Sequence, residues 1–111
     1  MDESVIKHFE EQQAAVVPVS EWIRRGIPLV NDYKFGFISM DLDDRPRGCA
    51  LGAAYYAKTR RTTYRFADGG KGNGVSDELG LPRHIFLRAS GMHATGSTRE
   101  EVADWLESQG L

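Results

Sequence analysis

The sequence predicts a single α+β domain over residues 1–111, mainly helical, with a small antiparallel β element. A chain of this length can bury one core, and 41% apolar with 27% charged residues is ordinary for a globular protein. Helix signals dominate both ends of the chain. Aromatic and β-branched residues gather instead around Tyr33–Met40 and Thr62–Ala67, so we expect these two regions to form the β element.

Two helices are expected near the N-terminus. Along Ser4–Val17, apolar residues recur at roughly helical spacing, and acidic residues stand at the start, where they favour a helix. Pro18 lacks a backbone N–H and disfavours a helical residue before it, so the first helix should end there. Ser20 can then cap a short second helix through Arg25, which Gly26 should terminate.

The middle of the chain predicts a strand, a turn and a buried helix. The strand at Tyr33–Met40 should lead into Asp41–Gly48, a segment rich in turn-forming residues. The following stretch, Cys49–Lys58, consists mainly of small residues, and its alanines and leucine favour a helix. We expect this helix to be central and buried, although Gly52 costs it about 1 kcal/mol relative to alanine.

Shorter helical signals follow the glycine-rich segment 69–74. Residues 76–79 can form one helical turn, and Pro82 is well placed to begin a helix through Ala89, with Gly91 just beyond it.

The last helix carries the clearest local signal. Thr98 and Glu101 match a capping box, in which the threonine hydroxyl and the glutamate carboxylate each accept a backbone N–H of the other residue. Val102, Trp105 and Leu106 then share one face, and Gly110 ends the helix. This signal concerns folding, because that face is better explained as buried than as a recognition surface.

Charge and composition exclude some classes of protein. The formal net charge of −2 argues against a general polyanion binder, but residues 45–71 hold seven Lys or Arg and a single Asp. No apolar stretch approaches the ~20 residues that cross a bilayer, and the acidic start differs from a secretory signal. Cys49 is the only cysteine, which excludes an intrachain disulfide. We therefore expect a cytoplasmic protein.

The basic central segment is the candidate ligand-binding region. Guanidinium groups fork onto phosphates and tyrosine rings stack on bases, so the segment could bind a nucleotide or nucleic acid. A solvated surface paired with the acidic flanks of the chain explains the same pattern, and an acidic protein partner would also satisfy it. The candidate residues are Arg45, Arg47, Tyr55, Lys58, Arg60, Arg61, Tyr64, Arg65 and Lys71.

Non-catalytic binding or regulation through a protein partner is the function that we favour. Aromatic and arginine residues dominate the energetics of protein interfaces, so an exposed aromatic residue beside charged groups would act as the anchor. The candidate anchors are Trp22, Tyr55, Tyr56 and Trp105.

An enzyme that uses Cys49 is the least favoured alternative. A thiolate nucleophile needs a base, here His84 or His93, and that base needs an orienting group, here Asp32 or Asp41. A single cysteine that opens an alanine-rich stretch is more often a small buried residue.

No cofactor and no metal are expected. The three histidines are isolated, and no Cys-x-x-Cys or His-x-x-x-His spacing occurs. The glycines at 69–74 could approach a phosphate, but they lack the Gly-Lys-Ser/Thr ending of a P-loop, so we interpret them as a connecting loop.

Two segments carry a resemblance to a known group of proteins. Gly48-Cys-Ala-Leu-Gly-Ala-Ala54, followed by Thr98-Arg-Glu-Glu-Val-Ala-Asp-Trp105, resembles small bacterial and phage proteins of unknown function. Those proteins pair a Cys-Ala-Leu-Gly-Ala segment with a capped C-terminal helix, and many carry an Asn-Asp pair that Ser90–Gly96 lacks. The resemblance implies no reaction, ligand or catalytic residue.

Overall fold

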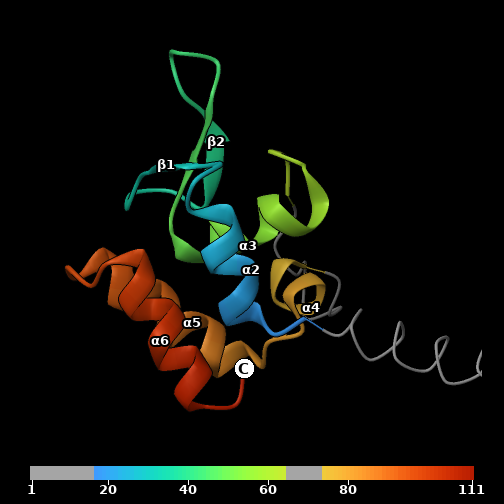
Figure 1. Ribbon diagram of the computed structural model, residues 1–111, viewed down its shortest axis with the longest axis vertical. Coiled ribbons are helices and arrows are strands. Elements are labelled where there is room, and N and C mark those ends of the chain that lie inside the picture. Colours follow the sequence, from blue (N-terminus) through green and yellow to red (C-terminus); the bar gives the residue numbers. More distant parts are fainter. Residues whose placement is uncertain (1–16, 65–73) are drawn as a thin grey trace, which may run out of the picture.

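A computed structural model describes residues 17–64 and 74–111 and confirms the α+β class. Five helices and three strands are present in these residues (Figure 1). Their order is α2 (Val19–Gly26), β1 (Asn31–Asp32), β2 (Ile38–Met40), β3 (Pro46–Gly48), α3 (Ala50–Thr59), α4 (Val75–Leu79), α5 (Arg83–Ala94) and α6 (Arg99–Ser108). The helix expected at Ser4–Val17 lies outside the described residues, apart from Val17 itself.

The strands form a mixed sheet in the order β1-β3-β2. Central β3 runs parallel to β1, with Asn31 beside Arg47, and antiparallel to β2, with Ser39 opposite Arg47. The sheet is therefore not purely antiparallel, and the partner of β2 is Pro46–Gly48, where the sequence predicted only a turn. The five residues 41–45 between β2 and β3 reverse the chain, and Asp44 among them adopts a left-handed φ of 61°. Thr62–Tyr64, the described part of the other expected strand, is not a strand.

Helix α3 is central and buried, as predicted. Its small residues allow two other segments to approach its backbone closely. A Cβ added at Gly52 would lie 1.6 Å from the carbonyl oxygen of Phe37, where the chain enters β2. A Cβ added to Gly26 at the end of α2 would lie 2.1 Å from the carbonyl oxygen of Ala53. Glycine at these positions is what lets α2 and β2 pack against α3.

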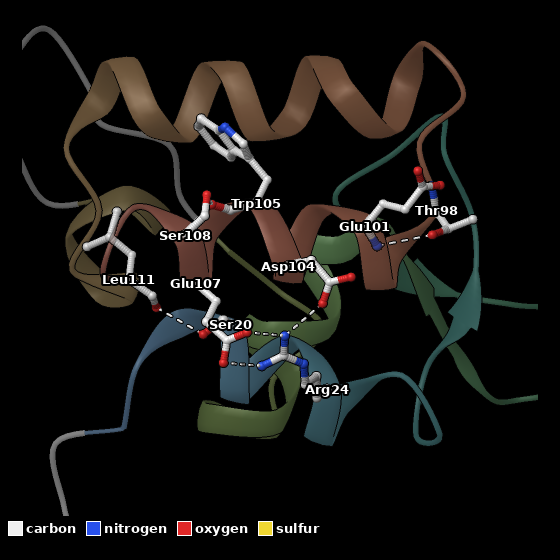
Figure 2. A network of polar contacts seen from close by, with 9 residues as sticks. All are labelled: Ser20, Arg24, Thr98, Glu101, Asp104, Trp105, Glu107, Ser108 and Leu111. Carbon is white, nitrogen blue, oxygen red and sulfur yellow. Dashed lines mark hydrogen bonds and ion pairs between the residues drawn. The ribbon is translucent and has the colours of Figure 1, made fainter.

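The predicted capping box of α6 is confirmed. Thr98 Oγ1 accepts from the backbone N–H of Glu101 at 3.1 Å, and Glu101 Oε1 accepts from the backbone N–H of Thr98 at 3.0 Å. Val102 and Leu106 are fully buried beneath the helix. On its other side, the Arg24 guanidinium of α2 bridges the carboxylates of Asp104 and Glu107, as Figure 2 shows.

Two helix termini differ from the sequence predictions. The residue preceding α2 is Pro18, and Ser20 is not its cap. Ser20 is buried, and both its backbone N–H and its hydroxyl donate to the Leu111 main-chain oxygen, which ties α2 to the end of the chain (Figure 2). Helix α5 continues past Gly91 to Ala94, because a glycine inside a helix weakens it without ending it.

Candidate functional site

The predicted basic residues fall into two groups at opposite ends of α3. Arg45 and Arg47 precede the helix, whereas Lys58, Arg60 and Arg61 end it or follow it. Ten residues of helix span about 15 Å, so the two groups do not form one phosphate-binding surface. Arg65, Lys71 and the glycine-rich segment that includes Lys71 lie outside the described residues, apart from Gly74.

Of the two described tyrosines of the predicted site, Tyr55 is withdrawn from solvent and Tyr64 is 38% exposed. Tyr55 is buried, and its hydroxyl donates to the Thr63 carbonyl at 2.8 Å. Tyr64 packs edge-on against Phe37, with ring centroids 4.7 Å apart. These contacts explain both residues as part of the packing between α3 and the chain that follows it.

Arg47 takes part in a stacked series on the outer face of the sheet. Its guanidinium lies 4.2 Å from the centre of the Tyr33 ring, and its Nε donates to Ser39 Oγ at 3.0 Å. Tyr33 in turn meets Phe35 edge-on at 6.1 Å. Arg47, Tyr33 and Phe35 therefore lie side by side on one surface, which we call the Phe35 surface.

A hollow of about 410 Å³ borders the Phe35 surface. It lies between the β1–β2 connection, which contributes Asp32 to Phe35, and the α5–α6 connection, which contributes Gly96 to Thr98. Phe35 is 81% exposed at its edge, so this large ring contributes little to the core. Lys34 extends over Phe35, with its Nζ 5.6 Å from the ring centre.

Asp32 and His93 meet at the base of this hollow. Nε2 of the buried His93 lies 3.0 Å from Oδ1 of Asp32. Buried Arg99 lies 3.9 Å from the same oxygen and donates to the carbonyls of Val30 and Ile27. Asp32 is 60% exposed, so its carboxylate faces the hollow while it also orients the imidazole.

This pair lacks the geometry of a catalytic base. In a nucleophile–histidine–carboxylate site, one imidazole nitrogen binds the carboxylate and the other reaches the nucleophile. Here His93 Nδ1 is buried and has no hydrogen-bond partner within the described residues. A nitrogen enclosed in this way cannot accept a proton from a group in the hollow.

Cys49 is likewise not arranged as a nucleophile. The thiol is buried, and burial raises its pKa, against the opposing effect of the backbone N–H groups of Gly52 and Leu51. The Nε2 atom of His93 is bonded to Asp32, so it is not the base for the thiol. His84, the other suggested base, is exposed on α5. Asp41, the other suggested orienting group, belongs to the β2–β3 turn. Of the residues proposed for a cysteine enzyme, only His93 and Asp32 form such a bond with each other.

The aromatic anchors expected from the sequence are not the exposed ones. Tyr55 is buried, while Trp22, Tyr56 and Trp105 are half-buried, each with an arginine guanidinium over its ring. The most exposed aromatic residue of residues 17–64 and 74–111 is Phe35, which lies within the strand expected at Tyr33–Met40. Its signal was present in the adjacent Gly36, a turn-forming residue that interrupts the expected strand.

No helix of the described residues has the length and apolar character needed to cross a membrane. Within the same residues, no three His, Cys, Asp or Glu side chains are grouped so that they could hold a metal ion. Comparison with known protein families, curated proteins and solved structures finds no match. The resemblance to small bacterial and phage proteins stays a prediction.

Proposed function

We propose that this protein is a non-catalytic binding domain that recognises a protein partner through the Phe35 surface. The observation that carries the proposal is the exposure of Phe35, whose ring stands 81% accessible at the edge of an open hollow. An aromatic ring left in water beside an arginine and a second aromatic ring is typical of an interface anchor.

The chemistry of the surface indicates what the partner offers. Phe35 suits an apolar cleft on the partner, and the hollow beside it can receive one of the partner's side chains. Asp32 can accept a hydrogen bond from that side chain, because only its Oδ1 is engaged with His93 and Arg99. The proposal places the protein in the cytoplasm, in keeping with its single unpaired thiol.

The nucleic-acid alternative receives less support. The basic residues that it would use, where the structure describes them, lie at opposite ends of α3, and Tyr55 is buried in the core. An enzyme receives less support still, because Cys49 and His93 are both buried and no hydrogen bond among the described residues joins the thiol to an imidazole nitrogen.

A photo-crosslinking amino acid at position 35 tests the proposal in the cells that naturally produce the protein. We expect one discrete protein adduct, identified by mass spectrometry, and none when the same group replaces the exposed Glu100 of α6. The adduct should weaken when Arg47 is changed to Ala, because the guanidinium stacks on Tyr33, whose ring meets that of Phe35 edge-on. Equal adducts from positions 35 and 100 would contradict the proposal.

A further inference from the structure

The turn between β2 and β3 presents a leucine entirely to solvent. Leu42 is 102% exposed, and Met40 before it is 48% exposed. Three carboxylates surround this leucine, those of Asp41, Asp43 and Asp44. We call residues 41–44 the hairpin tip; in Figure 1 it extends beyond the labelled helices and strands.

The hairpin tip is held in one shape by its own hydrogen bonds. Asp41 Oδ1 accepts from the backbone N–H of Leu42 at 2.7 Å, and Asp43 Oδ1 accepts from that of Arg45 at 3.2 Å. The Asn31 side chain of β1 reaches both Asp41 and Asp43. Leu42 is therefore presented in an ordered turn, which lowers the entropy lost when a turn binds.

A second hollow, also of about 410 Å³, lies on the opposite part of the molecule. Its walls come from the start of α2, the end of α4 and the end of the chain, with Pro18, Trp22, Leu79 and Leu111 among its apolar lining. Of the described residues, Lys58 is the only charged side chain that lines it. We call it the Lys58 hollow.

The cation that lines the Lys58 hollow is available to a ligand, as are the two cations that follow it in the chain. Lys58 donates to the main-chain oxygen of Glu78, not to its carboxylate, which leaves two of the three ammonium hydrogens free. Exposed Arg60 and Arg61 follow in the chain. None of the three forms an ion pair within residues 17–64 and 74–111.

We propose that the hairpin tip of one molecule binds the Lys58 hollow of a second copy of this chain. Leu42 enters the apolar hollow, and Asp43 and Asp44 face Lys58. Each surface supplies what the other lacks, because an apolar side chain flanked by carboxylates meets an apolar cavity that holds a lysine. This contact uses neither Phe35 nor the hollow beside it, so it is independent of the function proposed above.

The positions of the two surfaces determine the kind of assembly. Figure 1 shows the hairpin tip at one end of the long axis and the C-terminus, which borders the Lys58 hollow, toward the other. A contact between two different surfaces is heterologous, so it repeats from molecule to molecule as a ring or an open chain. Tip-to-tip pairing is disfavoured, because it would bring the two sets of three carboxylates together.

Two complementary variants test the proposal. Leu42→Asp removes the apolar tip and keeps the Lys58 hollow, whereas Lys58→Glu keeps the tip and reverses the charge at the hollow. Both side chains are exposed, so circular dichroism should show that both variants fold. Leu87→Asp, at a leucine that is 58% exposed on α5, is the matched control.

We expect the average mass of the wild-type protein, measured by sedimentation equilibrium, to rise beyond that of a dimer with concentration up to roughly 1 mM. Leu87→Asp should behave in the same way. Leu42→Asp and Lys58→Glu should each remain monomeric alone, and their mixture should form a 1:1 dimer that grows no further. Raising the salt concentration should weaken the assembly, because exposed charges contribute to it.

Three outcomes would overturn the proposal. A wild-type protein that stays monomeric over the whole range would do so, as would a mixture of the two variants that forms no dimer. Oligomers that survive Leu42→Asp would show that another surface forms them. Phe35→Ala should leave the assembly unchanged, so a failure here and a failure of the function proposed for the Phe35 surface are distinguishable.

Discussion

His93 of α5 and Asp32 of β1 are joined by a bond of 3.0 Å between Nε2 and Oδ1, across 61 residues of sequence. The imidazole is almost fully buried, whereas the carboxylate reaches solvent at the hollow beside Phe35. The bond therefore links a helix to the sheet edge that carries the Phe35 surface. With His93 Nδ1 enclosed, its role is to hold this edge in place.

His93→Ala should lower the free energy of unfolding by about 2 kcal/mol, because it opens a cavity and removes the partner of Asp32. Urea denaturation followed by circular dichroism measures the change. Asp32→Asn keeps an oxygen acceptor for Nε2–H and should cost less. A His93→Ala protein as stable as the wild type would show that the bond between His93 and Asp32 does not stabilise the fold.

Arg99 and Arg24 offer a comparison between a buried and an exposed arginine. Arg99 is buried and donates to the Val30 carbonyl at 2.7 Å, so Arg99→Ala leaves a buried acceptor without a partner and should cost about 3 kcal/mol. Arg24 lies at the surface between Asp104 and Glu107, where solvent screens its ion pairs. Arg24→Ala should therefore cost much less in the same urea titration. Equal losses would contradict the structural role assigned to Arg99.

One substitution at two glycines should have opposite effects. Gly52→Ala would place a Cβ 1.6 Å from the Phe37 carbonyl oxygen, so α3 and β2 must separate, and we expect a loss of more than about 3 kcal/mol or a failure to fold. At Gly91, inside α5, an added Cβ meets nothing within 4 Å. Gly91→Ala should raise stability by about 0.5–1 kcal/mol through helix propensity. Thermal unfolding of both variants decides the matter, and a tolerated Gly52→Ala would refute the close packing.

The contrast between α6 and the sheet shows which features a sequence can predict. The capping box is visible in the sequence because its two residues lie three positions apart and bond to each other. The partner of β2 is set by a turn at Asp44 and by packing on α3, neither of which the local pattern of Pro46–Gly48 reveals. Ser20 was misread for the same reason, since its partner, Leu111, lies 91 residues away.

The candidate site was harder to predict than the fold. Arg47 was chosen for its charge, yet its contacts with Tyr33 and Ser39 depend on the mixed sheet. Phe35 was assigned to a strand, because an aromatic residue between Tyr33 and Phe37 fits a strand pattern equally well. Exposure is a tertiary property, and composition indicates it only on average.

Cys49 should resist thiol reagents in the folded protein. Burial raises its pKa from the ordinary value of 9.0, so little thiolate forms near neutral pH, and only 8% of the residue is exposed. Labelling should be roughly a hundredfold slower than in urea, because it requires local opening. Labelling at equal rates in the two conditions would contradict the burial.

The same thiol predicts how stability changes with pH. A native pKa above the unfolded one means that Cys49 stabilises the fold fully below the unfolded pKa. That contribution declines as the pH rises above about 9 and is lost above the native pKa. The stability difference between the wild type and Cys49→Ala should therefore shrink in alkaline solution, as urea titrations at several pH values would show. A difference that stays constant with pH would argue against the shift.

The affinity of the Phe35→Ala protein for the partner captured at position 35 tests the proposed function most directly. Isothermal titration calorimetry with the purified partner should show binding about 30-fold weaker than that of the wild type, a loss of about 2 kcal/mol. Leu87→Ala, at an exposed leucine of α5, should bind within about twofold of the wild type. A Phe35→Ala protein that is folded and binds as tightly as the wild type would contradict the account.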